Sequence, residues 1–173
     1  MNKILVLAAV IFVSFILGYV FYSNTATMTD PTASTNNSPA QNTPTLATDI
    51  EAYFAIFTNG TFRIFTSSMY HNLSPDAYIE ANNPHAVHVK KAGITWGDFF
   101  STLPFELRSD CLTTGTGQTF CTGDNGTLKF YINGARNDDA LEAEIKDGDR
   151  LLVTFGTESK EEIRQQLNTE VLR

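Results

Sequence analysis

The sequence predicts an α+β domain, in which a mixed β-sheet carries one packed helix and a C-terminal helix, preceded by an N-terminal transmembrane helix. The chain has 173 residues, which is room for one domain and its extensions. Its first 22 residues are almost uniformly apolar. Beyond residue 48, alternating apolar runs indicate strands, and two stretches with apolar residues three and four positions apart indicate helices. One helix lying across a mixed sheet is an α+β arrangement.

Residues 1–22, MNKILVLAAVIFVSFILGYVFY, form the predicted membrane anchor. Residues 4–22 carry no charge, and as an α-helix they would be about 28 Å long, close to the hydrocarbon core of a bilayer. Lys3 precedes this segment, and no Lys or Arg follows it before Arg63. This asymmetry predicts a single-pass protein whose domain lies on the extracytoplasmic side. A cleaved signal sequence is the alternative, and it would also export the domain.

Residues 23–48 form a predicted disordered linker. Ser, Thr, Asn and Pro make up 18 of these 26 positions, and such a stretch buries too little apolar surface to offset its ordering entropy. The exported domain is therefore expected to span residues 49–173.

The charge of the chain argues against nucleic acid as a partner. The formal net charge is −7, and all of it falls on residues 49–173, because Lys3 and Asp30 cancel in the preceding part. A negative domain without a Lys/Arg cluster repels phosphate backbones.

The domain opens with a predicted β-hairpin, AYFAIFTNGTFRIF. Two aromatic and β-branched runs flank Asn59-Gly60, the pair that a tight type I′ turn prefers. Because both faces would carry large apolar groups, we expect this hairpin to be central and covered. The cross-strand pairs that this turn predicts are Phe57–Phe62, Ala55–Ile64 and Phe54–Phe65.

An irregular excursion is predicted over residues 67–83, followed by a short strand, PHAVHVK, and a helix, ITWGDFFSTLP. Thr95 is the predicted cap of this helix, with Asp98 three residues further on, and Pro104 ends it. Its predicted apolar face consists of Trp96, Phe99, Phe100 and Leu103.

The C-terminal third predicts two strands and a helix. Residues 128–132 alternate in polarity, residues 151–155 form a second strand, and Asn133-Gly134 and Asp147-Gly148 mark turns. Ser159 and Glu162 form a capping box for the terminal helix, whose apolar stripe is Ile163, Leu167 and Val171.

The end of this region resembles known β-grasp domains. YING at residues 131–134, followed by IKDGDRLLVTFG at residues 145–156, is similar to the closing strands of ubiquitin-like sulfur carriers and of the β-grasp module of transcobalamin-like proteins. The resemblance covers about residues 87–156 and implies a β-grasp-like sheet.

A broader resemblance is to an uncharacterised family of membrane-anchored, exported bacterial and archaeal proteins. It rests on TWGDFF at residues 95–100, on the cysteine pair, on YING, on residues 147–156 and on EEIRQQ at residues 161–166. Some members are labelled protein-disulfide isomerase, and the family implies His-rich patches in the first half of the domain.

Cys111 and Cys121 are the only cysteines, ten positions apart with two glycines between them. A thioredoxin-type site needs C-x-x-C, and a structural zinc site needs four ligands, so both of these alternatives fit poorly. Outside the cytoplasm two cysteines normally oxidise. We therefore predict a structural disulfide that closes a hairpin or loop, worth about 2.5–3 kcal/mol in the chain-entropy model.

His71, His85 and His88 are the candidate ligands for copper or zinc. The family implies His-x-His pairs, but this sequence has His88-Val89-Lys90 in the corresponding place. On a regular strand His85 and His88 point to opposite faces. A metal site would therefore need a bulge, or His71 with a carboxylate such as Asp76 or Glu80.

No catalytic signature is recognisable in the sequence: there is no G-x-S-x-G, and no Ser/His/Asp set suggests itself. We predict a non-enzymatic domain without a cofactor that binds an unknown protein or small-molecule ligand. An apolar patch is expected between residues 67–83 and the sheet, with Met69, Tyr70 and Tyr78. Metal binding is the alternative, and a thiol–disulfide oxidoreductase is the second alternative.

Overall fold

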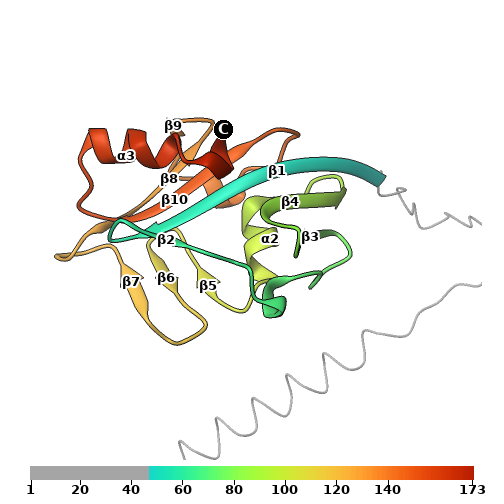
Figure 1. The fold of residues 1–173 in the computed structure, drawn as a ribbon, viewed down its shortest axis with the longest axis horizontal. Coiled ribbons are helices and arrows are strands. Elements are labelled where there is room, and N and C mark those ends of the chain that lie inside the picture. Colours follow the sequence, from blue (N-terminus) through green and yellow to red (C-terminus); the bar gives the residue numbers. More distant parts are fainter. Residues whose placement is uncertain (1–46) are drawn as a thin grey trace, which may run out of the picture. The chain divides into compact units, whose positions relative to one another are not determined.

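The structure, a computed structural model, describes residues 47–173 (Figure 1). The predicted anchor, residues 1–22, and residues 23–46 of the predicted linker lie outside the described residues. The last two linker positions, Ala47 and Thr48, already belong to the first strand. None of the helices formed by residues 47–173 has the length and apolar character that a membrane span requires.

The main sheet is mixed and has seven strands in the order β3-β4-β1-β10-β8-β9, with β2 also paired to β1. The strands that come first and last along the chain, β1 and β10, are parallel neighbours in this sheet. Every other pairing is antiparallel. The strands are β1 (Ala47–Thr58), β2 (Thr61–Arg63), β3 (Ala77–Glu80), β4 (Asn83–Lys91), β8 (Thr127–Ile132), β9 (Ala135–Arg136) and β10 (Arg150–Gly156).

A second, small sheet and two short helices complete the fold. The small sheet is antiparallel and consists of β5 (Glu106–Leu107), β6 (Cys111–Thr113) and β7 (Thr119–Cys121). The helices are α2 (Trp96–Ser101) and α3 (Lys160–Leu167), with single 3₁₀ turns at η1 (Ser68–Tyr70), η2 (Ala140–Glu142) and η3 (Glu170–Leu172). The predicted α+β class, a mixed sheet with one packed helix and a C-terminal helix, is confirmed for these residues.

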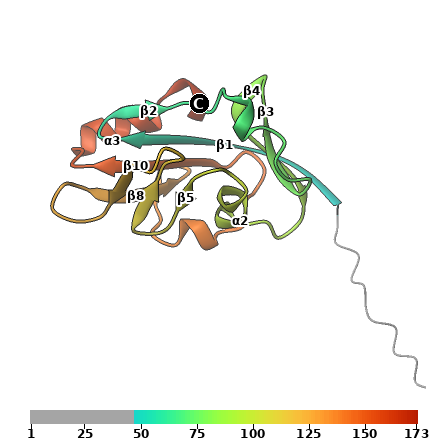
Figure 2. The same cartoon turned by 90° about the horizontal axis from the view of Figure 1, so that it is seen from below.

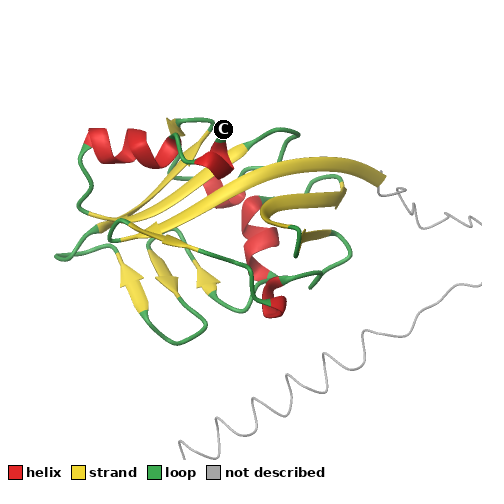
Figure 3. Cartoon of the chain, viewed as in Figure 1, coloured by secondary structure: helices red, strands yellow, loops and turns green. Residues whose placement is uncertain are grey.

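The main sheet separates two cores, as Figures 2 and 3 show: α3 and η3 cover one face, and α2 and the small sheet cover the other. Side chains of β1 alternate between them, because successive residues of a strand point to opposite faces. Phe54 and Ile56 enter the larger core, and Ala55 and Phe57 enter the smaller one. Both central strands are thus buried on both sides, which explains their continuous apolar runs.

Both predicted helix starts are confirmed. Thr95 accepts a hydrogen bond from the Asp98 N–H while the Asp98 carboxylate accepts one from the Thr95 N–H, and Ser159 and Glu162 form the same reciprocal pair. The apolar face of α2 is completely buried. The terminal helix is shorter than predicted, since α3 ends at Leu167 and Val171 lies in η3.

The predicted hairpin is only partly correct. Asn59 and Gly60 have φ values of 49° and 73°, as a type I′ turn needs, and Phe57 pairs with Phe62. The Ala55–Ile64 pair does not form, because β2 ends at Arg63. The reason is competition for one edge: β4 already occupies the same edge of β1 up to Tyr53. Phe54 and Phe65 still meet, with ring centroids 5.1 Å apart.

The prediction of an irregular segment over residues 67–83 is wrong for part of it. Residues Ala77–Glu80 form β3, which pairs with β4 and sends Ala77 and Ile79 into the larger core. A strand of four residues with only two apolar positions gives too short a pattern to recognise.

A buried ion pair ties β8 to the segment after β10. Lys129 Nζ lies 2.6 Å from Glu158 Oε2 and 3.0 Å from the Gly156 carbonyl oxygen, and Thr154 Oγ1 donates to Glu158 Oε1 at 3.0 Å. Both charged side chains are at least nine-tenths buried. Burial raises the pKa of Glu158, but the hydrogen bonds from Lys129 and Thr154 outweigh it, so the net pKa is lowered.

We expect Glu158→Gln to lower the free energy of unfolding by about 3 kcal/mol, because it leaves the buried Lys129 ammonium without a counter-charge. Since the folded pKa of Glu158 is lowered, the carboxylate stabilises the fold above its unfolded pKa and loses this effect as pH falls. Urea unfolding followed by the fluorescence of the single Trp96 measures the difference. Glu161→Gln, at an exposed pair with Arg164, is the matched control and should change little. Equal effects of the two variants would contradict this assignment.

Candidate functional site

A concave apolar groove of about 350 Å³ opens between the chain that follows β2 and the small sheet. One wall comes from β2 and residues 64–70, and the other from β6 and the loop that leads to β7. Ile64 and Met69 line it and are 64% and 50% exposed. Large apolar side chains held open to solvent beside a concavity are typical of a binding surface.

The floor of the groove is a rigid aromatic cluster. Phe65 lies with its ring centroid 5.1 Å from that of Tyr70 and 5.8 Å from that of Phe105, and all three residues line the groove. Phe62 stacks on the buried ring of His85 at 4.9 Å. These contacts fix the floor, because close-packed rings in a core have few alternative arrangements.

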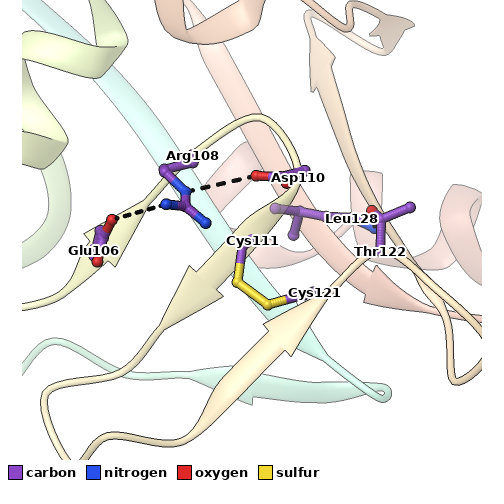
Figure 4. The surroundings of a disulfide bond; sticks show 7 residues. All are labelled: Glu106, Arg108, Asp110, Cys111, Cys121, Thr122 and Leu128. Atoms are coloured by element: carbon purple, nitrogen blue, oxygen red, sulfur yellow. Dashed lines mark hydrogen bonds and ion pairs between the residues drawn. A yellow bond between two sulfur atoms is a disulfide. The ribbon is translucent and has the colours of Figure 1, made fainter. Parts of the chain in front are cut away.

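The disulfide supports the opposite wall, and it confirms the predicted pairing of Cys111 with Cys121. The two residues face each other across β6 and β7, with Cα atoms 4.0 Å apart (Figure 4). Leu112, next to Cys111, is one of the residues that line the groove. The loop beyond is closed by two hydrogen bonds, from the Thr114 N–H to the Gln118 carbonyl oxygen and from the Gln118 N–H to Thr114 Oγ1, so this wall has a defined shape.

Position 115 of this wall has room only for glycine. A Cβ atom at this position would lie 2.8 Å from the carbonyl oxygen of Pro104. Any larger residue would push the loop away from the segment that precedes β5, and the groove would change shape.

The three histidines are not gathered into one site. His71 Nε2 lies 2.9 Å from the Phe65 carbonyl oxygen, and His88 stacks on Tyr78 and lies 3.7 Å from Glu51. His85 is buried against Phe62 on the other face of β4, in agreement with the predicted alternation. Within residues 47–173, no group of three or more His, Cys, Asp or Glu side chains is placed to hold a metal ion. Metal binding therefore gains no support from this arrangement.

His85 has a structural environment. It is 6% exposed, and its Nδ1 has no hydrogen-bond partner within the described part of the chain. Burial lowers the pKa of the imidazole, although a hydrogen bond with the Phe54 backbone opposes this effect. The neutral ring thus serves as an aromatic support for Phe62 beneath the groove.

The apolar patch predicted from the sequence is located correctly in part. Met69 and Tyr70 line the groove, whereas Tyr78 faces away from it and stacks on His88. Sequence reasoning missed Arg63, Ile64 and Leu112. No local signal could have indicated them, because their exposure depends on where β2 leaves β1.

The chain has no match in comparisons with protein-family models, with curated proteins or with solved structures. The resemblance to exported β-grasp-like proteins therefore stays a prediction.

Removing the disulfide with Cys111→Ala and Cys121→Ala should lower the free energy of unfolding by about 2.5–3 kcal/mol, because the unfolded chain regains the entropy of its closed loop. Urea unfolding of the double variant measures this change. The wild-type protein with its disulfide reduced keeps both cysteine side chains and is therefore the control for side-chain loss. An unchanged midpoint would show that the small sheet needs no covalent support.

The free energy of unfolding should also fall as the pH drops below about 6.5, which is the ordinary pKa of a histidine side chain. The pKa of His85 is lowered in the folded protein. Below the ordinary pKa of histidine, the unfolded chain is therefore protonated at this residue while the folded chain is still neutral there. We expect His85→Phe to flatten the difference in unfolding free energy between pH 7.5 and pH 5.5, and His88→Phe, on the other face, to preserve it. A full pH dependence in His85→Phe would assign the effect to another group.

Proposed function

We propose that this chain is a membrane-anchored extracytoplasmic domain that binds an apolar ligand, or an apolar side chain of a partner protein, without catalysing a reaction. The observation on which the proposal depends is the apolar groove, where Ile64 and Met69 stay exposed beside a concave aromatic floor. Holding such side chains in water is unfavourable unless something covers them.

The lining of the groove supports binding over catalysis. Its neutral side chains are aromatic, aliphatic, hydroxyl-bearing or, at Gln118, an amide, and Arg63 and Tyr70 are its only titratable members among the described residues. General acid–base and nucleophilic chemistry rely on histidine, carboxylate or cysteine side chains, or on an activated serine or threonine. Both cysteines of the chain are held in the disulfide, which gives the oxidoreductase alternative no free thiol.

The location outside the cytoplasm is supported by the disulfide, because such bonds persist in oxidising compartments. The uncharged stretch of residues 4–22, with Lys3 before it, supports retention as an anchor. The finer fold that we propose is β-grasp-like. Its support is the central parallel pair of first and last strands, with an antiparallel neighbour on each outer side.

Methyl NMR can test this function directly. The chain has three methionines, and Met69 is the only one among residues 47–173. In full-length protein labelled at the methionine methyls, a neutral apolar probe such as octanamide should shift the Met69 signal and leave those of Met1 and Met28 unchanged.

A charge introduced in the groove should move this shift to higher octanamide concentrations. We expect Ile64→Asp to weaken octanamide binding by about tenfold or more, because the probe would have to desolvate a carboxylate. Leu73→Asp is the matched control, since Leu73 is 46% exposed but does not line the groove. An unchanged Met69 signal in the wild-type protein at saturating octanamide would rule out the groove as the binding site.

A further inference from the structure

We propose that the groove selects amphipathic carboxylates, meaning small molecules in which an apolar chain or ring bears one carboxylate, and that Arg63 is the residue that recognises the charged end. This inference rests on the proposed binding function and specifies its ligand class. The inference depends on a single guanidinium that has no ion-pair partner among residues 47–173 and lies at an otherwise uncharged apolar groove.

Arg63 is held in place by two neighbours that use only part of its guanidinium. Nε donates to Thr58 Oγ1 at 2.7 Å, and Nη2 donates to the same oxygen. The guanidinium carbon lies 5.3 Å from the ring centroid of Phe120, a cation–π contact. Nη1 takes part in none of the hydrogen bonds formed within the described residues. A guanidinium that is fixed along one edge presents the other edge to a ligand at little entropic cost.

Arg63 is one of the cations of this domain that form no ion pair among residues 47–173. The protein carries a net charge of −7, and six of the eleven Lys and Arg residues between positions 47 and 173 are paired with a carboxylate. Arg63 takes part in none of the ion pairs in that part of the chain. Among the residues that the structure describes, it is also the only charged one that lines the groove. The groove is therefore a local positive site on a negative domain, which favours an anionic ligand.

Phe120 places the guanidinium at the small-sheet wall. It is the cross-strand partner of Leu112, which lines the groove. The loop of this wall adds Thr114 and Thr116, whose hydroxyl oxygens lie 3.0 Å apart, and Gln118. These groups can hydrogen-bond a carboxylate, and the exposed Ile64 and Met69 can cover an apolar tail. A planar carboxylate suits the two-donor edge of a guanidinium better than a single hydroxyl or amide does.

The alternative role of Arg63 is purely structural: it would only link β1 to β7 through its contacts with Thr58 and Phe120. That role would stabilise the fold, but it would give no preference between charged and neutral ligands. The two explanations therefore differ in ligand selectivity and can be separated by a matched pair of ligands.

The test is calorimetric titration of the full-length chain in lipid nanodiscs with octanoate and with octanamide, using empty nanodiscs as the blank. The two probes have the same chain and differ in the charge of the head. We expect octanoate to bind about tenfold more tightly, as a charge-assisted hydrogen bond at a partly exposed site allows. The preference should shrink as salt rises.

Arg63→Met should bring the affinities for octanoate and octanamide close to each other, and a Met69 methyl signal that octanamide still shifts would report an intact groove. Arg63→Lys should keep part of the preference, because it retains the charge and loses the planar fork. Arg164→Met, an equal change of charge on the exposed face of α3, is the control and should leave the ratio unchanged.

Three outcomes would overturn the inference. If wild-type protein binds both probes equally, the groove binds apolar ligands but Arg63 does not select them, and the proposed function stands alone. If octanoate keeps its advantage in Arg63→Met, another group recognises the carboxylate. If neither probe binds, the proposed function fails together with the inference.

Discussion

The parallel pairing of β1 with β10 is the constraint on which the rest of this structure depends. It joins the first and last strands of the domain in continuous register, from Tyr53 opposite Arg150 to Thr58 opposite Phe155. Hydrogen bonds from Tyr53 N–H to the Asp149 carbonyl and from Asn59 N–H to the Phe155 carbonyl extend it at both ends. Because the pair is buried on both faces, it divides the interior into two cores, and every other strand of the main sheet is added to its outer edges.

The candidate site arises from how one of those edges is shared. β4 pairs with the first part of β1, and β2 pairs with the last part, so neither partner can run the full length. Where β2 stops, at Arg63, the chain turns away from the sheet and leaves Ile64 and Met69 exposed across from the small sheet. The same ending fixes Arg63 between Thr58 and Phe120. The shape of the groove and the position of the Arg63 guanidinium therefore both follow from the end of β2 at Arg63.

Two reinforcements hold elements that are too short to persist alone. The strands of the small sheet have two or three residues each, and so short a sheet is marginal in water. The disulfide joins two of them, and Phe120 and Leu112 anchor them in the larger core. On the other side of the main sheet, the buried pair of Lys129 and Glu158 secures the turn that leads into α3. One reinforcement shapes the groove, and the other keeps the C-terminal helix on the sheet.

The features that obey local rules could be predicted from the residues alone. The two capping boxes, the turns at Asn59-Gly60 and Asn133-Gly134, and the face of α2 follow from residues within a few positions of one another. The disulfide was predictable because the chain has only one possible pair of cysteines. Three features could not be predicted in this way: the end of β2 at Arg63, the pairing of residues 77–80 as β3, and the meeting of Arg63 and Leu112 at one groove. These outcomes depend on which strand pairs with each part of one edge of β1, and the pairing residues are far apart in the chain.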